Sequence, residues 1–409
     1  MMNTIAFLGL TDDEFAKLAV KLVPIAMVFG GLLGIVPFLV FLERKVCAWI
    51  QNRDGPSRVG LLGPDSPLEI LGIKSGKRRI LGGFLQSLAD AFKLITKEAF
   101  VPAGADKFLF AMGPFFALMP PFLAFIVMPV GPDIGLFGQS IKLQIADLHV
   151  GLLWVLGVAS LSAYGLAFGG WASNNKFALL GGVRAMAQMI SYEVGMGIIL
   201  LSVIMMHQSV SLREIVNHQA ASDCTCNWGI WHQPLAFILF TICAFAENNR
   251  LPFDLAECEA ELIGGYHTEY NSMHFGMFFQ GEYIAMLSMG ALIAALFLGG
   301  WHYPGYNALM AIAKVDGANQ FNMMQALAVG LGLASFGLKA FAFVVFAMWV
   351  RWSLPRFRWD QLMNIGWKGV IPLALLNLLV TAYLNLPVAP KVEKPGEVKP
   401  VAAMVSKKF

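Results

Sequence analysis

The sequence is poor in charged residues and in cysteine. Only 13% of its 409 residues are charged, whereas soluble domains average about a quarter, and 57% are hydrophobic. The net charge of +3 is too small to indicate nucleic-acid binding. The five cysteines lack the spacing of a four-ligand zinc or iron–sulfur site, so no bound metal or cluster is expected in this chain. Composition therefore favours a membrane protein.

The only close pair of cysteines is Cys224 and Cys226. We interpret them as two unrelated loop thiols, with a disulfide or a metal clip as the alternative. The N-terminal region carries Asp12, Asp13 and Glu14 before the first apolar run, with no basic stretch and no evident cleavage site. No cleaved signal peptide is therefore predicted.

Apolar runs of about 20 residues predict an all-α fold, a polytopic transmembrane helical bundle, because a segment within lipid must satisfy its own backbone hydrogen bonds. About eight spans are expected within a membrane domain of residues 1–389. Their approximate ranges are 18–41, 108–130, 150–170, 185–206, 234–253, 274–300, 324–350 and 369–387. Residues 390–409 are basic and Pro-rich, which predicts a disordered tail.

Lys and Arg are concentrated in the loops after spans 1, 3, 5 and 7, above all in the long loop 42–106. The positive-inside rule places these loops in the cytoplasm and both termini outside. Within the long loop, Phe84–Phe100 has apolar residues at helical spacing and charged residues on the other side. This pattern predicts an interfacial amphipathic helix, which acts either as a plain surface anchor or as a guide for an amphiphilic substrate.

Acidic residues at membrane depth are the clearest indication of chemistry. Glu193 falls within the fourth span and Glu282 within the sixth, where a carboxylate costs at least about 2.5–3.5 kcal/mol. Six more acids lie between spans 5 and 6, where only Arg250 balances them: Glu247, Asp254, Glu257, Glu259, Glu261 and Glu269. Like charges four residues apart on a helix repel, which favours protons shared among the acids. Each loop acid alone fits a solvated residue or a helix cap, but the set predicts a proton path.

A second charged cluster follows the first span, in the stretch FLERKVCAWIQNRDGPSRVG. It contains Glu43, Arg44, Lys45, Arg53, Asp54 and Arg58. Cations that extend toward the interface at a cytoplasmic helix end are ordinary, so composition alone indicates a membrane anchor. Nothing in the spacing requires a particular ligand.

Four blocks of the sequence resemble the H-subunit family of the proton-pumping NADH–quinone oxidoreductase, respiratory complex I. They are ERKVCAWIQNRDGPSRVG, GWASNNKFALLGGVRAMAQMISYE, AENNRLPFDLAECEAELIGGYHTEYNSM followed by FFQGEYIAM, and LPRFRWDQLMNIGWK. The resemblance implies a membrane protein that joins the peripheral redox arm to the membrane arm and lines the quinone chamber. It implies quinone as the substrate, with the iron–sulfur clusters and flavin in partner subunits and no redox centre in this chain.

The resemblance also assigns residues, none of them catalytic in this chain alone. Those implied to line the quinone chamber are Glu43, Arg44, Lys45, Arg53, Arg58, Asp90 and Lys93. Those implied to form the proton path are Glu193, Glu257, Glu259, Glu261, Glu269 and Glu282. Those implied to order the junction loops are Arg184, Arg250, Asp254 and Tyr270. The implied partners are peripheral redox-arm subunits at the cytoplasmic loops, antiporter-like membrane subunits and the lipid of a bacterial inner membrane.

Two departures from the family pattern are a basic insertion at residues 61–83, which contains KSGKRR, and long external segments at 207–233 and 301–323. The external segments suggest contact with an additional subunit. One alternative function is the membrane subunit of an energy-converting hydrogenase or formate hydrogenlyase, which uses no quinone. The others are a stand-alone cation/proton antiporter and an inert anchor for the peripheral arm.

Overall fold

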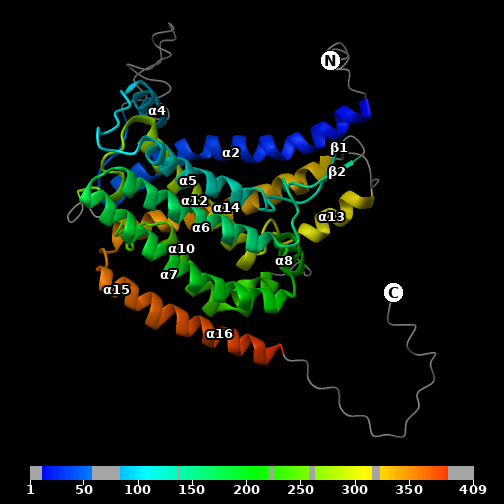
Figure 1. Cartoon of the computed structure of the whole chain (residues 1–409). Helices are drawn as coiled ribbons and strands as arrows, with labels where there is room; N and C mark the ends of the chain where they lie inside the picture. The colour runs from blue at the N-terminus through cyan, green and yellow to red at the C-terminus, as the bar shows by residue number, and fades with distance from the viewer. Residues whose placement is uncertain are drawn as a thin grey trace.

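The computed structural model describes residues 12–57, 83–136, 139–220, 225–257, 263–315 and 323–385. Its long helices lie side by side along a common direction (Figure 1). They are α2 (Asp12–Ile50), α5 (Lys107–Phe125), α6 (Gly151–Ala172), α7 (Lys176–His207), α10 (Pro234–Glu247), α12 (Ser272–Phe297), α14 (Met323–Ser353), and α15 (Trp359–Asn364), which continues through the π-helical turn η3 (Ile365–Val370) into α16 (Ile371–Leu384). The predicted all-α bundle is confirmed.

Seven helical segments in the described part of the chain are long and apolar enough to cross a membrane, so the chain is an integral membrane protein. The segment predicted as the fifth span is the exception. Helix α10 has 14 residues and ends at Glu247, and at 1.5 Å per residue it is about 21 Å long, shorter than a hydrocarbon core of about 30 Å. The helix ends early because the chain turns at Asn248 and Asn249, and Asn249 has a left-handed φ of 48°.

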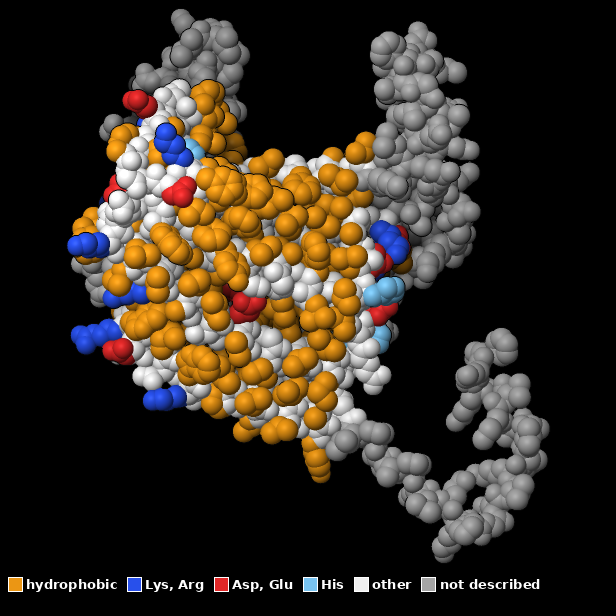
Figure 2. Space-filling view, viewed as in Figure 1, with side chains coloured by type: hydrophobic (Ala, Val, Ile, Leu, Met, Phe, Trp, Pro, Cys, Tyr) orange, Lys and Arg blue, Asp and Glu red, His pale blue; other side chains and the backbone are white. Residues whose placement is uncertain are grey.

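Short elements cover the two ends of the bundle. Near one end lie α4 (Gln86–Thr96), α15 and the turn η2 (Gly265–His267). The other end carries α8 (Leu212–Gln219), η1 (Thr225–Asn227), α9 (Gly229–His232), α13 (Tyr306–Val315) and the antiparallel hairpin of β1 (Ile134–Leu136) and β2 (Gln139–Ile141) (Figure 1). Hydrophobic side chains spread over the middle of the face seen in Figure 2, and most Lys and Arg side chains lie toward the end with α4 and α15.

Helix α4 has the amphipathic character that the sequence predicts. Its apolar side chains Leu88, Phe92 and Ile95 are more than half exposed. The Ser87 hydroxyl donates a hydrogen bond of 2.6 Å to the carbonyl of Pro37, which ties α4 to α2. An exposed apolar face on a helix held beside the bundle fits a position in the membrane interface.

The helices pack through small residues and buried hydrogen bonds. A Cβ atom on Gly165 of α6 would lie 2.5 Å from the backbone nitrogen of Ala117, so glycine is required for the close approach of α5 and α6. Polar contacts join α16 and α15 to α7. The amide of Asn377 on α16 donates to the Ser202 hydroxyl on α7 at 3.0 Å. The hydroxyl of Tyr192 donates to the carbonyl of Leu362 at 2.9 Å. These polar contacts hold α15 and α16 against α7.

Cys226 corrects one interpretation from the sequence. It lies in η1 and is disulfide-bonded, so the interpretation of Cys224 and Cys226 as two unrelated thiols is wrong for Cys226. A disulfide is stable where the surroundings are oxidising, as they are outside the cytoplasm. Cys224, residues 61–82 of the basic insertion and the tail 390–409 lie outside the described residues.

Gln219 fastens the end of the bundle that carries α8. Its side chain is buried and donates to the carbonyls of Ala295 and Leu296, each at 3.0 Å. Its side-chain oxygen accepts from the amides of Gly229 at 3.1 Å and Gly299 at 3.0 Å. One amide group thus satisfies four backbone groups where α8, α9 and the end of α12 meet.

We expect Gln219→Ala to lower the free energy of unfolding by at least about 3 kcal/mol, because each buried polar group left unpaired costs about 1–3 kcal/mol. Thermal denaturation of the purified protein in mild detergent checks this. Asn217→Ala is the matched control, since Asn217 lies on the same helix and is exposed. Equal denaturation midpoints for the two variants would contradict the role assigned to Gln219.

Candidate functional site

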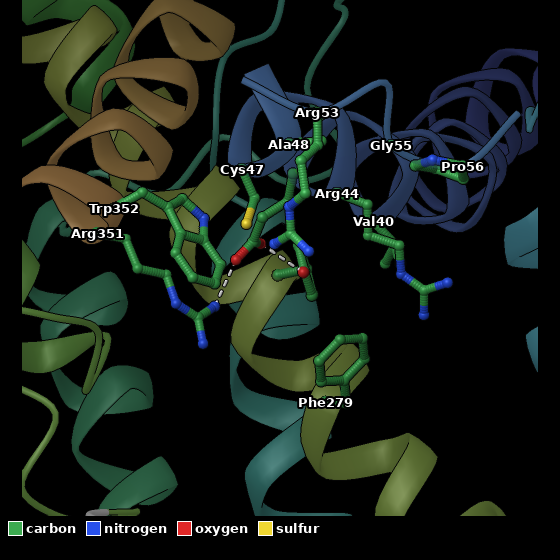
Figure 3. A pocket seen from close by; sticks show the side chains of 12 residues that line it. Val40, Arg44, Cys47, Ala48, Arg53, Gly55, Pro56, Phe279, Arg351 and Trp352 are labelled. Carbon is green, nitrogen blue, oxygen red and sulfur yellow. Dashed lines mark hydrogen bonds and ion pairs between the residues drawn. The ribbon is translucent and has the colours of Figure 1, made fainter. Parts of the chain in front are cut away.

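A cavity of about 630 Å³ lies between the C-terminal end of α2, the beginning of α12 and the end of α14 (Figure 3). Its lining includes the apolar residues Val40, Cys47, Ala48, Pro56, Phe279 and Trp352, together with Gly55. Its polar lining residues are Glu43, Arg44, Arg53, Tyr283 and Arg351. The volume falls in the range of about 300–1,000 Å³ that small-molecule sites occupy. The cavity therefore suits an amphiphilic ligand with a polar head.

The carboxylate of Glu43 forms the polar base of this cavity and is only 5% exposed. Arg250 Nη1 donates to its Oε2 at 2.8 Å, and Arg351 donates to its Oε1. The Tyr283 hydroxyl also donates to Oε2, and the Arg250 guanidinium lies 4.5 Å from the centre of the Tyr283 ring. A buried carboxylate is tolerated only when it is paired in this way. We call Glu43, Arg250, Tyr283 and Arg351 the Glu43 cluster.

Arg250 connects the Glu43 cluster to a second group of acids. Burial lowers the pKa of Arg250, but the negative charges around it, first that of Glu43, raise it well above its ordinary value. Arg250 Nη2 lies 3.6 Å from Glu282 Oε2. The two terminal guanidinium nitrogens of one buried cation therefore each face a different carboxylate.

Glu282 in turn hydrogen-bonds Glu257, and the phenol of Tyr266 lies beside both. The Tyr266 oxygen lies 3.1 Å from Glu282 Oε1 and 3.4 Å from Glu257 Oε1. Burial, and next the negative charge of Glu282, raise the pKa of Glu257 well above its ordinary value. His267 Nδ1 lies 3.7 Å from the same Glu257 oxygen. These groups form a compact cluster of titratable side chains in and beside the loop that follows α10.

Asp254 anchors that loop to the segment after α14. Its carboxylate is buried and accepts from Arg356 Nη2 at 3.0 Å, and the rings of Phe253 and Phe357 stack at 5.6 Å. Burial raises the pKa of Asp254 even though Arg356 opposes the shift. The backbone amide of Glu257 donates to Asp254 Oδ1 at 3.4 Å, which positions the neighbouring acid.

Glu247 lies between Glu282 and Glu193. A cavity of about 50 Å³ is lined by Glu282, Tyr266 and Glu247, and a second of about 30 Å³ is also lined by Glu247. Each exceeds the roughly 10–15 Å³ that one water requires. Among the described residues, Glu247 Oε2 has no hydrogen-bond partner. Glu193, partly buried on α7, hydrogen-bonds Ser160 and interacts electrostatically with Glu247.

Of the remaining chamber residues predicted from the sequence, Arg44 and Arg53 line the cavity, whereas Lys45, Asp90 and Lys93 are not among its lining residues. Arg44 pairs with Asp90 of α4 at 2.6 Å, and both side chains are partly exposed. The Lys45 ammonium donates to the carbonyl of Asp54 at 2.9 Å, Arg53 hydrogen-bonds Gln51 while lining the cavity, and Lys93 is exposed on α4. Arg58 lies outside the described residues.

The other predicted residues are more dispersed. Glu269 accepts a hydrogen bond of 2.8 Å from Asn175, and Arg184 is partly buried near the start of α7. Tyr270 donates to the carbonyl of Phe110 at 3.0 Å and stacks on the Phe110 ring at 4.0 Å, which fixes the loop against α5. Glu259 and Glu261 lie outside the described residues, and Glu257 precedes them in a bend.

Three residues of the site were not selected from the sequence: Tyr266, Tyr283 and Arg351; Glu247 was counted among the loop acids but was not assigned to the proton path residue by residue. Arg351 is one of many cations near a span end, and no spacing distinguishes it. The two tyrosines are distinguished only by neighbouring acids, Glu282 for Tyr283 and Glu269 for Tyr266. Glu247 carried the strongest available signal, an acid directly after an apolar run. Within the described ranges, no group of three or more His, Cys, Asp or Glu residues is placed to hold a metal ion.

Comparison with known proteins agrees with the sequence blocks. The model of the NADH dehydrogenase family matches residues 23–382. A protein of Flavobacterium johnsoniae, named as the H subunit of NADH-quinone oxidoreductase, is 43% identical over 373 residues, which cover 91% of this chain and 97% of the relative. H subunits of the same enzyme from Flavobacterium psychrophilum and Geobacter metallireducens are each 44% identical and cover 90% of this chain and 97% of their own. The chain therefore belongs to the H-subunit family of NADH-quinone oxidoreductase.

Proposed function

We propose that this chain is a membrane subunit of a proton-translocating NADH–quinone oxidoreductase that lines the quinone chamber and couples quinone reduction to proton transfer. The names of the relatives supply the quinone and the NADH. The observation that carries the proposal is structural: Glu43, Tyr283 and Arg351 line the cavity, and Glu43 shares its partner Arg250 with the acids that lead toward Glu193.

The cavity has the chemistry that a quinone needs. Phe279 and Trp352 offer apolar surface to the ring and the beginning of the tail, while Arg44, Arg53 and Arg351 supply hydrogen-bond donors and positive charge. Positive side chains stabilise negative charge that develops on quinone oxygens as electrons arrive. In this proposal the chamber residues only bind and orient the substrate. The electrons therefore come from a partner subunit.

Coupling follows from the shared cation. At an effective dielectric constant of 20, a unit charge acting over 4 Å contributes about 4 kcal/mol, enough to change which acid holds a proton. A change of charge in the cavity alters how strongly Arg250 attracts Glu43, and therefore how strongly it stabilises the Glu282 carboxylate. Protons then redistribute along Glu282, Glu257, Glu247 and Glu193, through the two small cavities. Glu259, Glu261 and Glu269 remain predicted members of this path.

The orientation and partners are part of the proposal. The end with the cavity carries the exposed cations Arg44, Arg53, Lys93 and Arg358, which supports a cytoplasmic location and docking of peripheral redox-arm subunits there. The beginning of α2 and the end of α16 lie at the opposite end, which supports termini outside a bacterial inner membrane (Figure 1). Antiporter-like membrane subunits would receive protons from the side of Glu193.

We expect Glu193→Gln to lower proton pumping and quinone reductase activity together, by at least about tenfold, because an amide cannot exchange a proton. Both rates are measured for the intact complex in vesicles, with complex content determined by the bound flavin. Glu98→Gln is the control, since Glu98 is exposed beside α4. Normal pumping by the Glu193 variant would remove Glu193 from the path.

We expect Glu43→Gln to destabilise the complex by about 3 kcal/mol, because Arg250 and Arg351 would lose their common counter-charge in a buried site. Asp90→Asn, which breaks the partly exposed pair with Arg44, should cost at most about 1 kcal/mol. Thermal inactivation of the purified complex measures both. Similar losses in the two variants would show that burial of Glu43 does not matter as argued.

A further inference from the structure

Three buried acceptor atoms belong to residues that line one small cavity. The cavity of about 50 Å³ is lined by Glu247, Asn248 and Asn249, and Glu282 is also among its lining residues. Glu247 Oε2, Asn248 Oδ1 and Asn249 Oδ1 are buried and have no hydrogen-bond partner among the described residues. A buried polar atom left unpaired costs about 1–3 kcal/mol. Three such atoms around one cavity therefore indicate a bound molecule that donates hydrogen bonds.

The backbone of α5 adds a fourth acceptor at the same place. Pro121 has no N–H, so the carbonyl of Ala117 lacks the donor that an uninterrupted helix would provide. Both residues line the cavity, and a Cβ atom on Gly281, another lining residue, would lie 2.8 Å from the Ala117 oxygen. At membrane depth, a backbone group without its helical partner is tolerated where it lines a hydrated cavity. The position of this carbonyl therefore also favours a hydrogen-bond donor in the cavity.

Water is the donor that fits this space. A cavity needs roughly 10–15 Å³ to hold one water, and a buried water typically makes about three hydrogen bonds to groups that would otherwise be unpaired. The second cavity, of about 30 Å³, is also large enough for water. The two cavities share Pro121, Ser162, Glu247, Asn248 and Ala285 as lining residues. Asn248 therefore lies where two spaces that can hold water adjoin.

The step from Glu282 to Glu247 is the one that needs such a water. Glu282 hydrogen-bonds Glu257 directly. In the described part of the chain, by contrast, no hydrogen bond joins Glu282 to Glu247, although both line the cavity of about 50 Å³. A proton that moves between these two acids therefore has to cross the cavity.

We propose that Asn248 and Asn249 are positioning residues that hold water between Glu282 and Glu247, and that the proton crosses through this water. The inference rests on the proposed function and adds two residues to the same path. Protonated Glu282 gives its proton to the water oxygen while the water passes another proton to the Glu247 carboxylate. One O–H bond forms on the water as another breaks, so the water is neutral before and after. The two amides exchange no proton and only orient the water.

The backbone conformation accounts for only one of the two asparagines. Asn249 has a left-handed φ of 48°, which asparagine adopts more readily than most residues. Asn248 ends α10 with a φ of −75° and is only 6% exposed, a position whose backbone does not require asparagine. Glycine at position 249 would preserve the turn without an amide. Substitutions can therefore separate the turn from the binding of water.

The test measures pumping and quinone reductase activity of the intact complex in vesicles, per bound flavin. Asn248→Leu keeps the approximate size of the side chain but removes the amide, and should lower both rates by about tenfold or more. Asn248→Ser retains an oxygen and leaves room for water, so it should keep most of the activity. Asn249→Gly keeps the turn and should give rates between these two.

Asn377→Leu is the matched control. Asn377 is a buried asparagine of α16 that hydrogen-bonds Ser202 and lines neither of the two small cavities. Its replacement should lower stability and leave the rates per bound flavin unchanged. Equal losses in Asn248→Leu and Asn248→Ser would show that Asn248 acts through packing, and would overturn the proposal.

A second measurement observes the water directly and does not depend on any variant. A structure of the intact complex at a resolution that shows ordered water should contain density about 2.7–3.2 Å from Asn248 Oδ1. An empty cavity there, or normal rates in Asn248→Leu, would overturn the proposal. That failure is separate from failure of the proposed function: if Glu247→Gln abolishes pumping while Asn248→Leu does not, the path stands without the asparagines. If Glu282→Gln pumps normally, both the path and its water link are wrong.

Discussion

The Glu43 carboxylate and its two guanidinium partners form the interaction on which the rest of the site depends. Arg250 and Arg351 would repel each other at the base of the cavity if no buried anion lay between them. Because these residues come from α2, α14 and the loop after α10, their pairing holds three distant parts of the chain in one arrangement. The Tyr283 hydroxyl fixes the carboxylate from α12. The cavity lies where these elements meet around the Glu43 carboxylate.

The remaining contacts fix the packing of the helices away from the Glu43 cluster. Glycine contacts such as Gly165 against Ala117 bring α5 and α6 close, and buried amide and hydroxyl groups hold α16 on α7. Gln219 fastens the far end without any titratable group. A series of acidic side chains runs from Glu43 to Glu193, with small cavities beside Glu247. Because the surrounding side chains are apolar, a change in the protonation of one acid in this series costs free energy. Such a change therefore affects the protonation of the next acid.

Much of this was predictable because lipid imposes strong rules on sequence. Long apolar runs predicted the long helices, and Glu193 and Glu282 were identified as acids within them. The predicted amphipathic stretch Phe84–Phe100 contains helix α4. The fifth span was predicted too long, since apolar residues resume after Glu247 at Leu251 and Pro252 although the backbone has already turned at Asn249. The pairing of Cys226 was also missed, because sequence spacing of two loop cysteines does not reveal which thiols approach each other.

The sequence by itself determined that the chain lies in a membrane, which residues carry charge there, and the family to which its motifs belong. These properties depend on local composition and on the cost of placing charge in hydrocarbon. Only the tertiary structure decided the partners. That Arg351 meets Glu43 across 308 positions of sequence, or that Tyr266 contacts both Glu257 and Glu282, follows from how segments far apart in the chain pack. Side chains at such separations leave no periodic signal, because their contact is set by the fold as a whole.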